Sequence, residues 1–455
     1  FYDFHESYLC LQKTKMQISY KHICRITIPV LVSLLVEYLI GFTDTAYLGR
    51  VGETELAASA LAGTYYMIIY MIGFGFSIGA QILIARYNGS RQYSQTGDVF
   101  TQGTIFLLLV ATLLFTLSYL YSPVVLRFLI DSEQVYLATI SYLNWRIYGF
   151  FFSFIIVMFR AFFIGTVNTR ILTINSIVMV LTNIILNYIL IFGKLGFPAL
   201  GIAGAAIASS ISEAVAVIFF LVYTRLQIDD QKYCLFQSLN VNRSILKKVL
   251  DISIWVMIQH GLVFGGWFVF FITVEHLGER SLATTNIVRN ISSFLFMFVQ
   301  AFASVNSSLV SNLIGEGKSD QVMKLCRKSI LLCYLFVLPM ALFIAIYPNL
   351  VLRTFTNNIG LITYSIPPLL VMLSSYLIAV PTFVWFCAVS GTGNTLSSLR
   401  IAVVSLFIYI SYITTVASYI PNLVLLWASE HIYFSGLLIL SLYFLLYHNW
   451  KQTKL

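Results

Sequence analysis

The chain has 455 residues, of which 59% are hydrophobic, 16% aromatic and only 10% charged. A soluble domain carries about 25% charged residues, because charged side chains cover the surface that faces water. Most of this chain's surface must therefore face lipid, which excludes a cytosolic enzyme, a disordered chain and a secreted disulfide scaffold. The formal charge of +9 does not indicate a nucleic-acid partner, because the basic residues lie between hydrophobic segments, as topology determinants do.

The cysteine spacing indicates no metal or disulfide site, and the N-terminal residues do not form a signal peptide. The six cysteines are scattered without Cys-x-x-Cys spacing, so we expect neither a disulfide framework nor a metal site. Residues 1–15 contain charged residues and no small-residue cleavage site, so they do not resemble a signal peptide. Met16 is a more natural start, and we expect residues 1–15 to be an upstream extension or the product of an alternative start.

Apolar runs between charged or Gly/Pro breaks predict an all-α polytopic membrane protein with twelve transmembrane helices. About 20 apolar residues are needed for a helix to cross a bilayer, whereas barrel strands are about ten alternating residues. The expected spans are 23–48, 57–85, 101–121, 137–164, 171–192, 200–224, 252–274, 283–312, 329–347, 361–388, 399–419 and 424–446.

The longest polar stretch divides these spans into two groups of six. This linker covers residues 225–250 and separates an N-lobe at 23–224 from a C-lobe at 251–446. Shorter cytoplasmic segments are expected at 1–22 and 447–455.

The basic residues predict the orientation of the chain. When both termini are placed in the cytoplasm, most of the 27 Lys and Arg residues lie at the termini or in loops on that same side. The exceptions on the other side are Arg50, Arg127, Lys194, Arg280 and Arg353. This bias favours cytoplasmic N- and C-termini in a plasma membrane, such as the bacterial inner membrane.

A shift of the chain by 226 residues reveals an internal repeat. Three clusters of identities fall in one gapless register, namely residues 52–57 on 278–283, 125–127 on 351–353 and 165–169 on 391–395. An even number of helices separates the copies, so both halves enter the membrane in the same direction. Two pseudo-symmetric six-helix lobes that face each other across a cleft are the architecture of an alternating-access carrier.

Several motifs resemble those of one transporter family. Pro29 precedes Asp44 by fifteen residues in the first helix, within the run FTDTAYLGRVG. The second helix ends in Gly-Ala-Gln followed by an exit glycine, and the fifth carries Asn183 and Asn187. A GIAGAAIA run follows, and Gly-Thr-x-Asn-Thr closes the fourth and tenth helices. In this order they resemble the multidrug and toxic compound extrusion (MATE) family, bacterial type, from about Met16 to the last helix.

The resemblance implies what the chain does. MATE transporters have two lobes and twelve helices, and they export amphipathic, often cationic drugs and other xenobiotics by alternating access. An inward gradient of H⁺ or Na⁺ drives this antiport, so we expect one of these coupling ions and no other cofactor. The expected partners are small drugs and the lipid bilayer, and we expect a monomer.

Ionisable side chains inside spans are candidate functional residues, because each costs about 2.5–3.5 kcal/mol on insertion scales. The N-lobe contains three such acids, Glu37, Asp44 and Glu213. The C-lobe acids Glu275 and Glu430 lie near predicted helix ends. We therefore expect the coupling chemistry in the N-lobe.

Asp44 falls where the family's N-lobe cation-coupling aspartate lies. A carboxylate shielded from water can take up a proton, or it can hold Na⁺ if enough oxygens surround it. Asn183 and Asn187 are spaced i,i+4 on one helix face, at family positions that bond this aspartate. Some branches have an aspartate at the place of Asn187, which argues against full sodium ligation here. Alternatively, Asp44 caps a helix end and the asparagines pack helices together.

Glu37 lies two turns before Asp44 on the same face, where the family commonly has glutamine in the drug cavity. It can attract cationic drugs, titrate together with Asp44, or form an ion pair with an arginine such as Arg289. Glu213 is expected to pair with Arg146 or a backbone group.

Other residues have two interpretations each. A bend at Pro29 is linked in the family to protonation of Asp44, but the proline can also make a static kink. Tyr66, Tyr70 and Met71 suit a cavity that adapts to different ligands, although we favour core or lipid-facing packing for most such residues.

The C-lobe lacks the cation site of other MATE branches. A glutamate in helix seven and an aspartate in helix ten correspond here to Val263 and Ala379. His260, beside Gln259, either relays protons or, as we favour, forms an interhelical hydrogen bond.

Three other functions compete with export. A lipid-linked oligosaccharide flippase of the same superfamily would show a cationic cavity, for which the span arginines Arg146, Arg160 and Arg289 are thin support. A membrane-embedded enzyme would need a catalytic motif such as HExxH, which is absent from the sequence. A channel would not require a two-lobe repeat.

Overall fold

The computed structural model describes residues 18–228, 230–235 and 242–452. Our expectations for residues 1–17, for parts of the 225–250 linker and for the last three residues lie outside this described part. Within it the fold is nearly all-helical, as predicted. Eleven described helices are long and apolar enough to cross a membrane, and a pair bent by 53° makes the twelfth if it is counted as one span.

The long helices contain the predicted spans to within one residue, but several extend beyond them. The first half contains α2 (Tyr20–Leu48), α3 (Glu53–Gly89), α4 (Tyr93–Leu129), the bent pair α5 (Glu133–Arg146) and α6 (Gly149–Gly165), α7 (Arg170–Phe192) and α8 (Gly201–Gln227). The second half contains α10 (Arg243–Glu275), α11 (Glu279–Gly315), α12 (Val322–Ile346), α14 (Ile359–Gly391), α15 (Thr395–Tyr419) and α16 (Leu423–Tyr447). Short elements are α9 (Asp230–Tyr233), α13 (Pro348–Leu352), η1 (Ser319–Gln321) and η2 (Trp450–Gln452). Helix α4 is eight residues longer at each end than its predicted span, and α10 begins at Arg243, inside the predicted linker.

The helix ends show why the chain turns where it does. Gly193 ends α7 in the left-handed conformation, with φ of 65°, which favours glycine because no Cβ is present. Asn422 begins α16 by accepting hydrogen bonds on Oδ1 from the amides of Val424 and Leu425. Such caps lie in the polar breaks that separated the predicted spans.

The repeat appears in the structure as a repeat of elements and contacts. A shift of 226 residues places α3 on α11, and it places the bent pair α5–α6 on the single helix α14. Thr169 Oγ1 donates to the carbonyl of Ile26 at 2.7 Å, and Thr395 Oγ1 donates to that of Ile252 at 2.8 Å. These two bonds are related by the same shift, so both halves are built on one plan.

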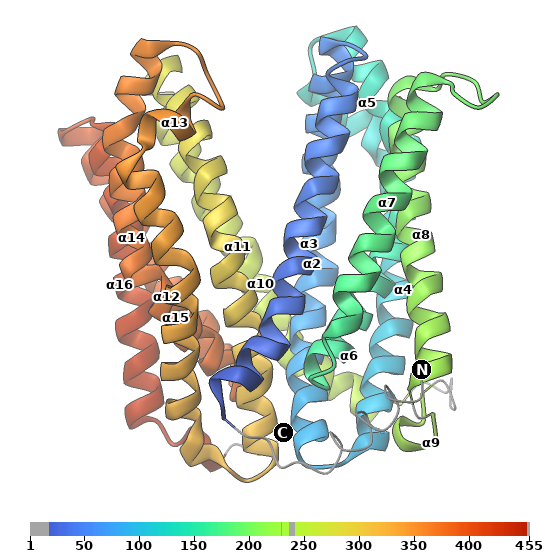
Figure 1. Ribbon diagram of the computed structural model, residues 1–455, viewed down its shortest axis with the longest axis vertical. Helices are drawn as coiled ribbons and strands as arrows, with labels where there is room; N and C mark the ends of the chain where they lie inside the picture. The colour runs from blue at the N-terminus through green and yellow to red at the C-terminus, as the bar shows by residue number, and fades with distance from the viewer. Residues whose placement is uncertain (1–17, 229, 236–241, 453–455) are drawn as a thin grey trace.

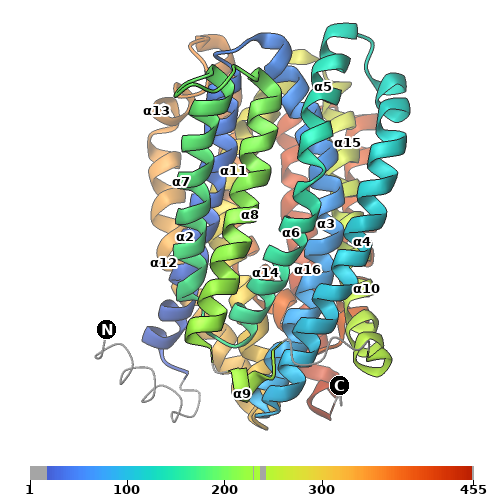
Figure 2. The same cartoon turned by 90° about the vertical axis from the view of Figure 1, so that its right-hand side faces the viewer.

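The two halves form two lobes that face each other. Helices α2–α8 make the N-lobe and α10–α16 the C-lobe, and their axes converge at the end that carries both chain termini (Figure 1). At the opposite end the lobes diverge. Figure 2 shows α7 and α8 side by side on the outer face of the N-lobe, with α2 behind α7. These three helices position the acidic site described below.

A close seam joins α3 and α11 near the terminal end of the molecule. A Cβ built on Gly89 would lie 2.1 Å from the carbonyl oxygen of Asn312. A Cβ on Gly315, the repeat equivalent of Gly89, would lie 2.3 Å from that of Arg86. Only glycine lets the two backbones approach this closely.

Hydrogen bonds between the lobes reinforce this seam. Arg86 Nη2 donates to the carbonyl of Thr392 at 2.7 Å, and its repeat equivalent Asn312 donates from Nδ2 to the carbonyl of Gly165 at 2.9 Å. Asn88 Nδ2 also donates to Asn312 Oδ1 at 2.8 Å. The structure is therefore closed between the lobes at the end that carries the termini.

Candidate functional site

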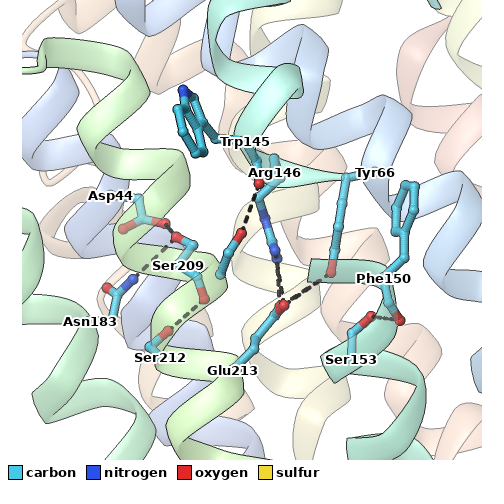
Figure 3. Close-up of polar contacts among 11 residues, drawn as sticks. Asp44, Tyr66, Trp145, Arg146, Phe150, Ser153, Asn183, Ser209, Ser212 and Glu213 are labelled. Carbon is cyan, nitrogen blue, oxygen red and sulfur yellow. Dashed lines mark hydrogen bonds and ion pairs between the residues drawn. The ribbon is translucent and has the colours of Figure 1, made fainter. Parts of the chain in front are cut away.

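A cavity of about 180 Å³ lies within the N-lobe, and the charged side chains of Asp44, Arg146 and Glu213 line it. Figure 3 shows the groups from α2, α3, α5 and α8 that point toward one another there. Its polar lining consists of Asp44, Tyr66, Tyr142, Arg146, Ser209, Ser212 and Glu213. The cavity thus brings together residues far apart in the sequence.

Asp44 occupies one wall of the cavity and is held by hydrogen-bond donors. Asn187 Nδ2 donates to Asp44 Oδ1 at 2.5 Å, and Ser209 Oγ donates to Oδ2 at 3.3 Å. Asn187 Nδ2 also lies 3.0 Å from Asn183 Oδ1, and Asn183 Nδ2 donates to Ser209 Oγ at 3.2 Å. Both asparagines are fully buried, whereas Asp44 keeps part of its surface exposed.

The structure therefore brings together the Asp44, Asn183 and Asn187 that the sequence singled out. Their role in coupling stays a prediction. Sequence reasoning missed Ser209, which lies on α8 shortly after the GIAGAAIA run. The small residues of that run were the available signal, because they let α7 and α8 approach closely.

A second element of the site is the ion pair between Arg146 and Glu213. Their two contacts measure 2.6 and 2.9 Å, and both side chains are nearly buried. Tyr66 Oη donates to Glu213 at 3.2 Å, while the guanidinium lies 3.6 Å from the centre of the Tyr66 ring. A Cβ on Gly149, just past the break between α5 and α6, would lie 2.1 Å from Arg146 Nη1. The absence of a side chain at Gly149 thus leaves room for the pair.

Glu37 forms a separate ion pair with Arg160 on α6. Arg160 Nη1 lies 2.6 Å from both carboxylate oxygens, and Ser33 and Ser176 donate to Oε1 at 3.1 and 3.2 Å. Glu37 is therefore the centre of a satisfied network within the N-lobe.

The expected pairing with Arg289 is wrong. Arg289 lies on α11, where Nη2 donates to Asn286 Oδ1 at 3.4 Å and the guanidinium lies 5.2 Å from the centre of the Phe271 ring. No ion pair of Arg289 is found among the described residues. Sequence reasoning had counted Arg160 among the span arginines but could not tell which of them reaches Glu37.

The other candidate residues are spread along the lobe. Tyr66 lines the cavity, but its ring is buried against the Arg146–Glu213 pair. Tyr70 stacks on Phe74 at 6.0 Å between centroids, and neither Tyr70 nor Met71 is part of the cavity lining. Their contact with a substrate stays a prediction.

Pro29 lies inside α2, where its carbonyl accepts a hydrogen bond from Thr173 Oγ1 on α7 at 2.9 Å. The hydroxyl of Thr173 thus ties the proline segment of α2 to α7. A bend of this segment that depends on Asp44 stays a prediction.

The C-lobe differs from the N-lobe in charge. The repeat equivalents of Asp44 and Arg146 are the uncharged residues Phe270 and Met372.

Glu430 lies near the start of α16, as its eighth residue, and it is only 6% exposed. Sequence reasoning placed this acid near a helix end but did not predict its burial. The interhelical hydrogen bond that we favoured for His260 is not found in the described part of the chain. Its ring packs edge-on against Phe74 at 5.6 Å.

In a comparison with known proteins, one family model matches both halves of the chain. A family model described as MatE matches residues 29–189 and 256–415. A probable multidrug resistance protein NorM of Mannheimia succiniciproducens is 27% identical over 302 residues, which cover 66% of this chain and 65% of that relative. The protein with the same description from Thermotoga maritima is 24% identical over 392 residues, or 85% of this chain and 83% of the relative.

Solved structures with similar folds cover almost the whole chain. A structure described as the outward-facing conformation of a multidrug resistance MATE family transporter has a TM-score of 0.84 at 19% identity, and 93% of each chain is covered. A mutant of the Vibrio cholerae MATE transporter VcmN has a TM-score of 0.85 at 19% identity, covering 95% of this chain and 98% of that one. At this level of identity the likeness concerns the fold.

Proposed function

The chain belongs to the MATE family, and we propose that this transporter exports amphipathic, often cationic drugs in exchange for protons that bind at Asp44. Its relatives include probable multidrug resistance proteins, which supports drugs and other xenobiotics as the exported class. The chain is a multi-pass membrane transporter and not an enzyme.

The observation that carries the proposal is the position of Asp44. Its carboxyl lines a cavity inside the N-lobe, and its bonds come from Asn187 and Ser209. No basic side chain forms an ion pair with Asp44 in the described part of the chain. A carboxyl of this kind can change its protonation state without first breaking an ion pair.

The ligands around Asp44 favour a proton over Na⁺. Hard cations are bound by several oxygen atoms, but the nearest partners of Asp44 are an amide N–H of Asn187 and a hydroxyl of Ser209, which both donate. The Arg146 guanidinium also lines the cavity and repels a second cation. A protonated Asp44 needs no further oxygen ligands and, being neutral, is not repelled by the Arg146 guanidinium.

The lobes supply the conformational step. If the termini are cytoplasmic, as the basic residues predict, the seam at Gly89 and Gly315 closes the cytoplasmic side and this conformation faces outward. Exchange requires that the proton bind one conformation more tightly than the other, because a coupling ion acts only through differential affinity. Drug leaves toward the outside when protons load Asp44, and the lobes then rock to reopen the cytoplasmic side.

Ethidium transport into everted membrane vesicles, which corresponds to efflux from a cell, tests the proposal under separately imposed proton and sodium gradients. We expect the wild-type protein to respond to the proton gradient alone, and Asp44→Asn to lose that response. Asp131→Asn is the matched control, because it makes the same change at an exposed position. Proton-driven efflux by Asp44→Asn at the rate of the control would remove Asp44 from the mechanism, and efflux driven by sodium would reject the proton.

A further inference from the structure

Glu430 is a buried acid in the C-lobe that the proposed mechanism does not use. It lies about 10 Å along α16 from the start of the helix and is 6% exposed. Tyr409 from α15 donates from Oη to Oε1 at 3.5 Å, and the ring of Tyr433 packs against that of Tyr409 at 5.4 Å between centroids. Tyr376 on α14 directs its Oη to the carbonyl of Ser292 at 2.6 Å. The acid is thus enclosed where α14, α15 and α16 pack together.

Glu430 differs from the acids of the N-lobe in its partners. Glu37 and Glu213 each face a guanidinium at 2.6 Å. No ion pair of Glu430 is found among the described residues, and the one side-chain hydrogen bond that its carboxyl accepts from them, from Tyr409, is long. Burying an unpaired ionised carboxylate costs several kcal/mol. In this conformation the side chain is therefore stable as a neutral acid that carries a proton.

The other titratable group near Glu430 on α16 turns away from it. His431 Nε2 lies 2.9 Å from Ser374 Oγ on α14, on the partly exposed side of the helix. The titratable groups near the carboxyl are Tyr409, which donates to it, and Tyr376 and Tyr433. None of them carries a positive charge that would hold Glu430 ionised.

The internal repeat relates the surroundings of Glu430 to those of Asp44. Asp44 is enclosed by α2, α7 and α8, and their repeat equivalents are α10, α15 and α16. Tyr409 occupies the position equivalent to Asn183, and Phe270 the position equivalent to Asp44.

In the C-lobe the acid comes from a different helix of this set. Phe270 packs against Trp427 at 5.3 Å between ring centres, and Trp427 lies one turn before Glu430 on α16. The helix equivalent to α2 thus supplies no carboxyl at this place in the C-lobe, and the buried acid Glu430 comes from α16 instead.

We propose that Glu430 is a second proton-binding site of this transporter, with Tyr409 as its positioning residue. The carboxylate takes a proton from water in one conformation of the C-lobe and returns it to water in the other. The proposal rests on proton coupling as proposed above, and it adds a proton carried by the lobe in which sequence reasoning expected none.

Infrared difference spectroscopy of the purified full chain in lipid bilayers tests this directly. Protonated carboxyl groups give a C=O band that disappears when the acid ionises, so a titration from about pH 5 to about pH 9 reports each buried acid without any substrate. We expect two such bands in the wild-type protein. Asp44→Asn should remove one of them and Glu430→Gln the other.

Two variants separate a proton site from a merely structural acid. Tyr409→Phe keeps the ring and removes the hydroxyl, so it should shift the Glu430 band and leave the Asp44 band unchanged. Protons released per bound ethidium should fall by about half in Glu430→Gln, since coupled sites share the total. Thermal unfolding of Glu430→Gln shows whether the variant is folded, because glutamine preserves the shape of the neutral acid.

The outcomes separate the two proposals. A Glu430 band that persists unchanged over the whole pH range, or a proton release unaffected by Glu430→Gln, would make Glu430 a permanent neutral acid and overturn the inference alone. A spectrum in which Glu430→Gln removes a titrating band but Asp44→Asn changes nothing would overturn the proposed role of Asp44 and leave Glu430 as the proton site.

Discussion

The glycine seam between the lobes makes the sharpest mechanical prediction. Gly89→Ala and Gly315→Ala each place a methyl group against the backbone of the facing helix. The distances to the carbonyl oxygens of Asn312 and Arg86 would be 2.1 and 2.3 Å, whereas real Cβ atoms essentially never approach below 3.0 Å. The two backbones must therefore separate by roughly 1 Å at the terminal end.

The cost of this separation depends on the conformation. Overpacking of a close contact costs about 1–3 kcal/mol, and the obstacles here are backbone atoms that cannot rotate away. If the seam opens when the lobes rock, the cost falls only on the conformation closed at the terminal end. A change of about 2 kcal/mol moves the equilibrium between the two conformations by roughly thirty-fold.

Spin labels across the far end of the molecule measure this shift. Phe197→Cys in the α7–α8 connection and Ile359→Cys at the start of α14 place labels on exposed positions of the two lobes, in a chain freed of its native cysteines. We expect the distance between the labels to shorten in Gly89→Ala and in Gly315→Ala. Gly63→Ala is the control, because a Cβ there meets nothing within 4 Å.

The two seam variants should behave alike, because they are equivalent by the repeat. Unchanged label distances together with a clearly lower melting temperature would mean that the methyl groups are absorbed by local distortion. The interpretation of the seam as the closing surface of a rocking motion would then be wrong.

Three further predictions concern the N-lobe. Gly149→Ala should weaken the ion pair beside it and cost about 1–3 kcal/mol of stability, seen as a lower melting temperature. Glu37→Gln should destabilise the protein by about 3–5 kcal/mol because it leaves Arg160 buried and uncompensated, and the double variant with Arg160→Gln should recover part of that loss in the same melting assay. A single variant as stable as the wild type would show that the pair is open to water. Asn187→Asp should let a sodium gradient drive efflux, because it adds oxygen ligands beside Asp44, and continued dependence on protons alone would contradict our account of ion selection.

The helices could be predicted from the sequence because each one is an apolar run that ends in a polar or glycine break. The repeat could be predicted too, since three clusters keep one register over 226 residues. The break between α5 and α6 could not. Local rules place kinks at prolines, yet α14 continues through Pro367, Pro368 and Pro381, while the chain bends by 53° just before Gly149.

The candidate site could be predicted only in part. Asn183 and Asn187 share one face of α7, so their contact with Asp44 could be predicted from the packing of α2 against α7 alone. The choice between Arg160 and Arg289 as partner of Glu37 depends on how distant helices pack, which no local pattern encodes. The burial of Glu430 could not be predicted either, because the position of a residue along a helix does not determine which neighbouring helices pack over its side chain.

Both buried ion pairs belong entirely to the N-lobe, and this has a consequence for biosynthesis. The partners of Glu37 and Glu213 are Arg160 and Arg146, and all four precede the linker in the chain. Each charge would cost about 2.5–3.5 kcal/mol if it remained alone in the membrane. A nascent chain completes both pairs as soon as its first half is inserted, so we expect that half to become stable while the ribosome is still translating the second.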